Sequence, residues 1–163
     1  MRALAILAVI FVIVPLLLLA AGQFGLLRGR VPEDLGVRDG KLKAPSKTEN
    51  SVSSQAALWK DGEFAAQSAA IEPLKVQGDP ATVLAKLKAM LATRRDVRIV
   101  TDRPDYLHAE FETRWLRFVD DVEFWVDPAA NVIQVRSASR IGRKDFDVNR
   151  ARVESIRTTL GAR

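Results

Sequence analysis

The side chains most capable of chemistry gather between residues 106 and 150. The chain has one histidine, His108, which shares a face of an expected strand over residues 106–113 with Glu110. An imidazole beside a carboxylate can act as an acid–base pair, so these two residues are the candidates for catalysis. No nucleophile elbow, phosphate-binding loop or dinucleotide fingerprint accompanies them. A lone histidine beside acids usually has a structural role.

A second group of polar residues favours binding. Acidic residues open an expected hairpin, and a serine–arginine run closes it before a basic helix. Guanidinium groups, hydroxyl groups and a helix N-terminus together suit an anion such as phosphate or carboxylate. The alternative is an internal network in which acids and arginines neutralise one another. The candidate ligand-binding residues are Asp120, Asp121, Glu123, Arg136, Ser137, Ser139, Arg140, Asn149 and Arg150.

The acidic residues lack the arrangement of a metal site. Strand alternation places Asp121 and Glu123 on one side of the sheet and Asp120 on the other, whereas hard cations need several oxygens in one shell. The chain has no cysteine, so neither a thiolate metal site nor a disulfide is possible. We therefore expect no metal ion and no cofactor.

Charge argues against nucleic acid as a partner. The formal net charge is +5, and Arg2, Arg28 and Arg30 supply three of these charges. From residue 31 onward, lysine and arginine (22) nearly balance aspartate and glutamate (20). Nucleic-acid binding needs a clustered basic surface, which this balance does not predict.

Residues 3–27 contain no charged side chain and are mainly apolar. About 20 apolar residues span the hydrocarbon core of a bilayer, whereas a secretory signal has an apolar region of about 7–15 residues. We predict an uncleaved single-pass transmembrane anchor over residues 1–30, with a cleaved signal as the alternative. Basic residues are more numerous after the run, at Arg28, Arg30, Arg38, Lys41 and Lys43, than before it, where only Arg2 stands. The positive-inside rule would therefore keep the C-terminal domain in the cytoplasm. This conflicts with the commoner arrangement, in which a domain after a short N-terminus is translocated.

The remaining chain divides into an arm and a folded domain. Residues 31–62 are rich in Pro, Gly and Ser and predict an extended arm or linker, with a turn at Asp39-Gly40. Residues 63–163 predict the domain. It begins with an edge strand over 70–76 and a helix that opens at Asp79 and Pro80.

Four strands joined by short turns follow, and a helix over residues 148–160 ends the domain, with Asp147 as its expected cap. A loop over residues 128–131 would pair Phe124 with Val135 and Glu123 with Arg136. The order strand, helix, four strands, helix predicts an α+β fold. Its antiparallel sheet has about five strands, two helices pack on one face, and one transmembrane helix precedes it.

Six segments, in order, resemble the uncharacterised family known as domain of unknown function 1499. They are residues 35–42 (LGVRDGKL), 51–56 (SVSSQA), 106–111 (YLHAEF), 118–124 (FVDDVEF), 132–142 (VIQVRSASRIG) and 145–157 (DFDVNRARVESIR). The resemblance implies a bacterial or plastid protein, often behind a signal or anchor, and no assigned activity.

Many members of that family have a cysteine pair in the arm. Here Ser51 occupies one of the two places, and the other falls near Pro45. Such a pair suits an oxidising compartment, so the resemblance implies a domain on the periplasmic side of a bacterial inner membrane. Asp147 stands where Gly is usual in the family.

These observations favour a membrane-anchored, non-enzymatic domain that binds a partner protein or a small anionic ligand through an acid/arginine face. One alternative is a hydrolase-like or other enzyme acting on a small or lipid-like substrate, with His108 and Glu110 or the cluster at residues 120–123. The other is an accessory subunit of a larger membrane protein complex.

Overall fold

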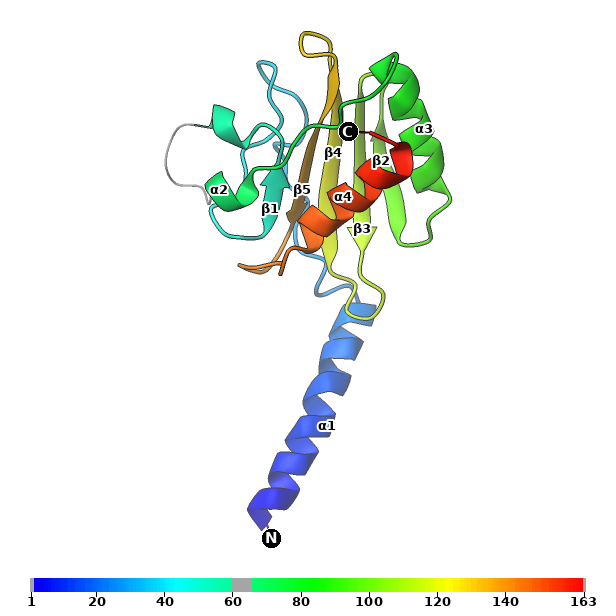
Figure 1. Cartoon of the computed structure of the whole chain (residues 1–163). Helices are drawn as coiled ribbons and strands as arrows, with labels where there is room; N and C mark the ends of the chain where they lie inside the picture. Colours follow the sequence, from blue (N-terminus) through cyan, green and yellow to red (C-terminus); the bar gives the residue numbers. More distant parts are fainter. Residues whose placement is uncertain (1, 60–65, 163) are drawn as a thin grey trace.

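Five strands form one antiparallel sheet in the order β1-β5-β4-β3-β2 (Figure 1). The fold comes from a computed structural model that describes residues 2–59 and 66–162, with side chains from 9 to 59 and from 68 to 162. The strands are β1 (Ser51–Ser53), β2 (Val97–Asp102), β3 (Tyr106–Glu112), β4 (Val119–Asp127) and β5 (Val132–Ser139). The predicted α+β class and five-stranded antiparallel sheet are confirmed.

Two helices, α3 (Pro80–Ala92) and α4 (Val148–Leu160), pack on one face of this sheet. Asp79 caps α3 as predicted, because its carboxylate accepts the amides of Ala81 and Thr82 at 3.2 and 3.0 Å. The core lies between the helices and the sheet. Its buried members include Leu84, Leu87, Leu91, Leu107, Phe111, Val122, Phe124, Val135, Val153 and Ile156.

The predicted position of the first strand is wrong. β1 lies at Ser51–Ser53, within the segment predicted as an arm, and residues 70–76 contribute only isolated bridges through Ala70 and Leu74. Pro73 has no amide hydrogen for a ladder, which limits pairing there. Two short helices, η1 (Ala56–Leu58) and α2 (Ala66–Ala69), also add to the predicted order.

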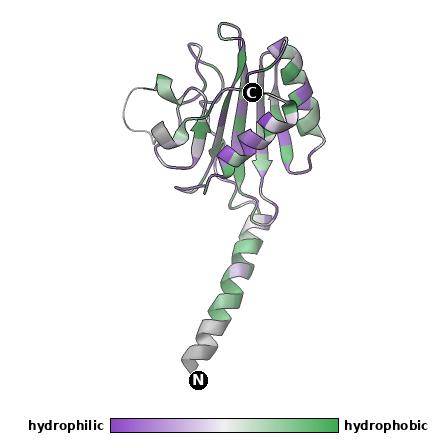
Figure 2. Ribbon diagram, in the orientation of Figure 1, coloured by the Kyte–Doolittle hydropathy of each residue, from purple (hydrophilic) through white to green (hydrophobic). Residues whose placement is uncertain are grey.

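The N-terminal helix α1 (Arg2–Gln23) projects away from the sheet, beyond the loop that joins β3 to β4. Its large apolar side chains from Val9 to Leu18 are exposed, and Figure 2 colours the part of the helix that follows its grey N-terminal turns as mainly hydrophobic. Within the described residues, no helix has both the length and the apolar character needed to cross a membrane. The transmembrane anchor therefore stays a prediction.

Candidate functional site

The predicted register of the β4–β5 hairpin is confirmed. Phe124 pairs with Val135 and Glu123 pairs with Arg136. Because side chains alternate along a strand, this register fixes which candidate residues share a face of the sheet. It divides them into two groups, one on the face that α3 and α4 cover and one on the opposite face.

The group on the face opposite the helices forms the buried ionic network. Its charged and titratable side chains are at most 4% exposed, although ion pairs of this kind usually lie at the surface. The residues come from the adjacent strands β3, β4 and β5, and Arg140 directly follows the last residue of β5. The network consists of Tyr106, His108, Glu110, Asp121, Glu123, Arg136 and Arg140.

Arg140 joins the two carboxylates at one end of this network. Its Nε and Nη2 atoms lie 2.8 Å from the two oxygens of Asp121, and Nη2 lies 2.5 Å from Oε1 of Glu110. Burial alone would raise the pKa of Asp121, but the hydrogen bonds and charge of Arg140, with a contribution from His108, hold it below its ordinary value. The pKa of Glu110 is lowered against its burial in the same way, by Arg140 and Arg98. Both carboxylates are therefore charged at neutral pH.

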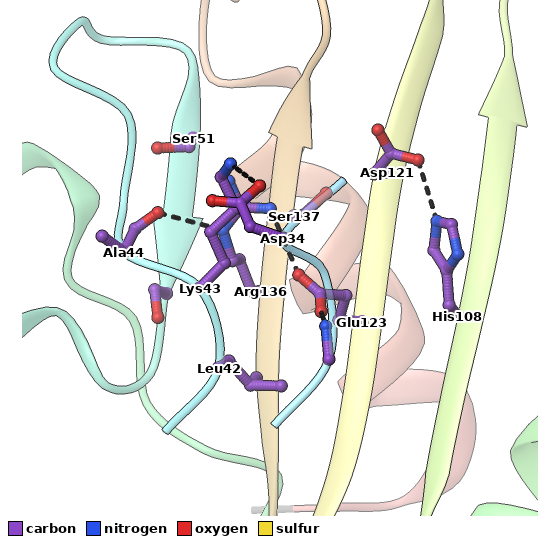
Figure 3. Close-up of polar contacts among 12 residues, drawn as sticks. Asp34, Leu42, Lys43, Ala44, Ser51, His108, Asp121, Glu123, Arg136 and Ser137 are labelled. Atoms are coloured by element: carbon purple, nitrogen blue, oxygen red, sulfur yellow. Dashed lines mark hydrogen bonds and ion pairs between the residues drawn. The ribbon is translucent and has the colours of Figure 1, made fainter. Parts of the chain in front are cut away.

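A second pair, Arg136 with Glu123, lies at the other end, where Nη1 and Oε2 are 3.3 Å apart. The Tyr106 hydroxyl donates to Oε1 of Glu123 at 2.8 Å. Burial, followed by the negative charge of Glu123, raises the pKa of Tyr106. Figure 3 shows the pair of Arg136 with Glu123 and the carbonyl of Ala44 accepting a hydrogen bond from Arg136.

The predicted pair of His108 with Glu110 does not form. His108 Nε2 instead lies 2.8 Å from Oδ1 of Asp121, a carboxylate that Arg140 also holds (Figure 3). The reason is geometric: His108 and Glu110 follow each other along one face of β3, whereas Asp121 lies on β4 opposite Glu110 and diagonal to His108. Five surface cavities of the described chain are lined by other residues, and no member of the buried ionic network lines any of them.

The second group lies beneath α4 and is centred on Asn149, which is fully buried. The Ser137 hydroxyl donates to the Asn149 amide oxygen at 2.5 Å, and the Asn149 amide nitrogen donates to the Ser139 hydroxyl at 3.1 Å. Asp120 faces this side and forms an ion pair with Arg152. These contacts hold α4 on the sheet.

Two residues at α4 differ from expectation. Asp147 makes no side-chain cap hydrogen bond, and Asp145 accepts the Asn149 amide at 3.0 Å instead. Arg150 joins neither group, because it donates to the carbonyls of Ser68 and Ala70 at 2.7 and 2.9 Å. Arg152, and not Arg150, is the arginine of the second group, because its Nη1 atom lies 2.6 Å from the Asn149 amide oxygen. The helical spacing of Asn149 and Arg152 was the signal for this contact.

The buried ionic network is covered by residues 28–46, the covering segment. The amide of Gly36 donates to Glu123 Oε1 at 2.7 Å, and the carbonyl of Ala44 accepts from Arg136 at 3.3 Å. Leu42 is fully buried, and its amide donates to the Gln55 side chain at 2.8 Å. The covering segment therefore closes the acid/arginine face that was expected to contact a ligand.

The exposed side of the covering segment carries cations. Arg38 and Lys41 exchange backbone hydrogen bonds of 2.9 and 3.0 Å around Asp39 and Gly40, whose φ values are 51° and 70°. Two positive φ angles define a type I′ turn, confirming the predicted turn at this place. Residues paired across such a turn point to one side, and alternation brings Lys43 to the same side.

These cations line the basic cavity, a hollow of ≈ 420 Å³ between the covering segment and Trp59. Lys41 Nζ lies 4.8 Å from the centre of the Trp59 ring, and Lys43 forms an ion pair with Asp34. The hydrogen bond from Lys43 lowers the pKa of Asp34. The charged residues lining the cavity are Asp34, Arg38, Lys41, Lys43 and Lys47.

The described residues do not form a candidate metal site. Among the described residues, no group of three or more histidine, aspartate or glutamate side chains is arranged to hold a metal ion. Asp121 and Glu123 lie on the same side of β4, as predicted, but each is bound by an arginine. Their positive partners occupy the space that a cation would need.

Comparison with known proteins identifies the family of the chain, but no individual relative. No curated protein matches the chain, and no solved structure does. The family model described as "Protein of unknown function (DUF1499)" matches residues 41–160, which include all five strands, α3 and α4. The chain therefore belongs to the DUF1499 family, as its six motifs suggested.

Proposed function

We propose that this chain is a membrane-associated, non-enzymatic domain that binds a small anionic ligand in the basic cavity. The observation that carries the proposal is the placement of Arg38, Lys41 and Lys43 on one side of a type I′ turn, around one hollow. Cations gathered on a concave surface attract an anion and donate charge-assisted hydrogen bonds to it. The cavity lining has four cationic side chains and one acidic side chain.

The buried ionic network supports binding over acid–base catalysis. A general base must come within hydrogen-bond reach of the proton that it removes. His108 is 3% exposed, lies against Asp121 and lines none of the five cavities. The acids and arginines first assigned to ligand binding satisfy one another, so the ligand-binding role passes to the cations of the covering segment.

Membrane association is proposed from residues 3–27. This run has no charged residue, and the side chains of α1 that the structure describes from Val9 to Leu18 are exposed. Exposed apolar side chains in such a density favour a covering of lipid or protein. We place the domain on the periplasmic side of a bacterial inner membrane, as the family resemblance implies.

Titration of the full chain in detergent with inorganic phosphate, pyrophosphate and citrate, at constant ionic strength, tests the ligand. We expect saturable binding of at least one of these anions. Arg38→Ala combined with Lys41→Ala should weaken it about tenfold or more, because each charge-assisted hydrogen bond is worth about 1.5–3 kcal/mol. Lys75→Ala combined with Lys86→Ala removes the same charge from exposed positions elsewhere and should leave binding unchanged. Absence of saturable binding, or equal loss in both double variants, contradicts the proposal.

Extraction of native membranes with alkaline carbonate tests membrane association. We expect the full chain to stay in the membrane pellet, and a variant that begins at residue 28 to appear in the supernatant. Protease added to intact cells with a permeabilised outer membrane should cut the domain if it is periplasmic. Recovery of the full chain in the carbonate supernatant would show that residues 3–27 do not hold it at a membrane.

A further inference from the structure

Exposed apolar side chains from three separate segments gather at the end of the domain from which α1 projects. The side chains of Phe24, Trp115 and Phe146 are 83%, 63% and 80% exposed. Leu26 and Val148 are exposed as well. Single exposed apolar residues are ordinary on a soluble surface, but a cluster of them marks a site of interaction. We name this surface, formed by residues 24–30, 113–118 and 140–148, the α1-proximal end (Figure 1).

Direct contacts join the end of α1 and the residues after it to the other two segments. The side-chain amide of Gln23 donates to the carbonyl of Trp115 at 3.1 Å. A Cβ atom added at Gly22 would lie 2.6 Å from the carbonyl oxygen of Leu116, and one added at Gly29 would lie 2.7 Å from Cβ of Arg140. Both contacts are closer than a side chain allows, so glycine is needed where the end of α1 packs against the domain.

The exposed ring of Phe146 lies in a turn with left-handed backbone. Phe146 and the adjacent Asp147 have φ values of 53° and 65°. The left-handed conformation costs a residue with a side chain about 1–2 kcal/mol, and the Asp145 carboxylate holds this turn by accepting the amides of Asp147 and Asn149 at 3.2 and 3.0 Å. The ring borders a cavity of ≈ 500 Å³, whose apolar walls include Phe118, Val119, Ile141 and Val148.

Positive charge accompanies these apolar groups. Apart from Arg140, which belongs to the buried ionic network, the three segments contain six arginine or lysine residues and two aspartates. Of these six, Arg28 and Arg117 pair with Glu112, and Lys144 pairs with Glu49. The guanidinium of Arg114 lies 4.9 Å from the centre of the Trp115 ring. Aromatic side chains together with cations are typical of protein surfaces at the interface of a bilayer, where cations attract anionic head groups.

We propose that the α1-proximal end docks onto the surface of a bilayer that contains anionic lipids. Trp115 and Phe146 insert at the boundary between head groups and acyl chains, and Arg114 contacts lipid phosphate. This inference rests on the membrane association proposed above, because a helix held in the membrane would bring this end to the lipid. The basic cavity then faces away from the membrane, since the covering segment runs from Arg28, at Glu110 and Glu112, toward the hairpin end of the sheet.

Depth-dependent quenching of Trp115 tests the docking. Trp59→Phe and Trp125→Phe leave Trp115 as the only tryptophan of the full chain. The protein is reconstituted into vesicles of phosphatidylcholine and phosphatidylglycerol in equal parts, with or without bromine near the head-group end of the acyl chains. We expect the fluorescence of Trp115 to be quenched in the brominated vesicles. The double variant Phe146→Ser with Arg114→Ala should lose this quenching. Val100→Ser, at an exposed apolar position on β2, is the matched control and should change nothing.

Flotation of the same vesicles separates this proposal from the one on which it rests. If the chain floats with the vesicles but the fluorescence of Trp115 is not quenched, the docking is overturned while membrane association stands. A protein partner would then be the occupant of the α1-proximal end. A chain that does not float overturns membrane association and the docking with it. Hydrogen exchange of the unsubstituted chain gives a second readout: lipid should slow exchange in residues 113–118 and 140–148, and equal exchange with and without lipid would contradict docking.

Discussion

Arg140 binds Asp121 through two parallel hydrogen bonds of 2.8 Å, one from Nε and one from Nη2, in the interior of the domain. A planar guanidinium matches a carboxylate in this geometry, which lysine could not reproduce. Both side chains are 2% exposed, and Nη2 also reaches Glu110. One arginine at the end of β5 therefore ties together the two neighbouring strands β3 and β4.

Replacement of Arg140 should cost far more stability than a surface arginine does. Arg140→Ala leaves Asp121 and Glu110 buried without their main positive partner, and breaking a buried pair costs about 3–5 kcal/mol. For a domain of this size, such a loss lowers the melting temperature by more than about 10 °C. Chemical and thermal unfolding followed by circular dichroism measure it.

Arg98→Ala is the matched control, because Arg98 also contacts Glu110 but its side chain is 63% exposed. A pair at that exposure is worth about 0–1 kcal/mol. Equal stability of Arg140→Ala and Arg98→Ala would contradict a structural role for Arg140. If Arg140→Ala abolished anion binding without loss of stability, the buried ionic network would be a ligand site after all.

The same carboxylates predict a loss of stability in acid. The pKa values of Asp121 and Glu110 are lower in the folded domain than their ordinary values, so folding favours their charged forms. Their contribution is complete above the unfolded pKa values of about 4 and is lost as the pH falls through the folded values. The free energy of unfolding, measured in urea from about pH 7 to about pH 3, should stay level to about pH 5 and then fall. In Arg140→Ala the free energy of unfolding should fall less steeply with decreasing pH. If its slope against pH is unchanged, groups other than Asp121 and Glu110 cause the loss of stability.

Local rules in the sequence predicted most of the fold. The spacing of Asp79, Pro80 and the leucines defined α3, and alternation along β4 and β5 allowed one register only, which the pairing of Glu123 with Arg136 confirms. β1 escaped these rules because Ser51 and Ser53 are polar and the strand is three residues long. Its burial depends on pairing with β5 and on the covering segment, which are contacts distant in sequence.

Alternation also predicted half of the site. It separated Asp120 from Asp121, and the same rule accounts for the observed division of Arg136 and Arg140 from Ser137 and Ser139. It could not show that residues 28–46 close the first face, since a segment with little periodicity carries no signal for the surface that it covers. The choice of Asp121 over Glu110 as the partner of His108 likewise depends on the pairing of β3 with β4, which places Asp121 diagonal to His108.

Asn149 should be the most sensitive position on α4. Its side chain is fully buried and its amide bonds Ser137, Ser139, Asp145, Arg152 and the carbonyl of Asn50. Asn149→Ala leaves several of these groups unsatisfied, and each costs about 1–3 kcal/mol. Ser155→Ala, on the exposed side of the same helix, should change the free energy of unfolding by less than about 0.5 kcal/mol. Similar values for the two variants in urea unfolding would show that the cluster contributes little.

Gly40 connects backbone conformation with ligand binding. Its φ is +70°, and a Cβ atom there would meet nothing within 4 Å, so Gly40→Ala changes the backbone preference without a clash. The left-handed conformation should cost the variant about 1 kcal/mol.

Because the turn places Arg38 and Lys41 side by side, strain in it should also misplace the two cations. We expect anion affinity in the titration above to fall by more than the small loss of stability explains. Asp39→Asn keeps a residue that accepts the left-handed conformation at the other central position of the turn, and should retain both stability and affinity. If Gly40→Ala lost stability but bound the anions as the unsubstituted chain does, the turn would support the fold without shaping the basic cavity, and the cations would need another role.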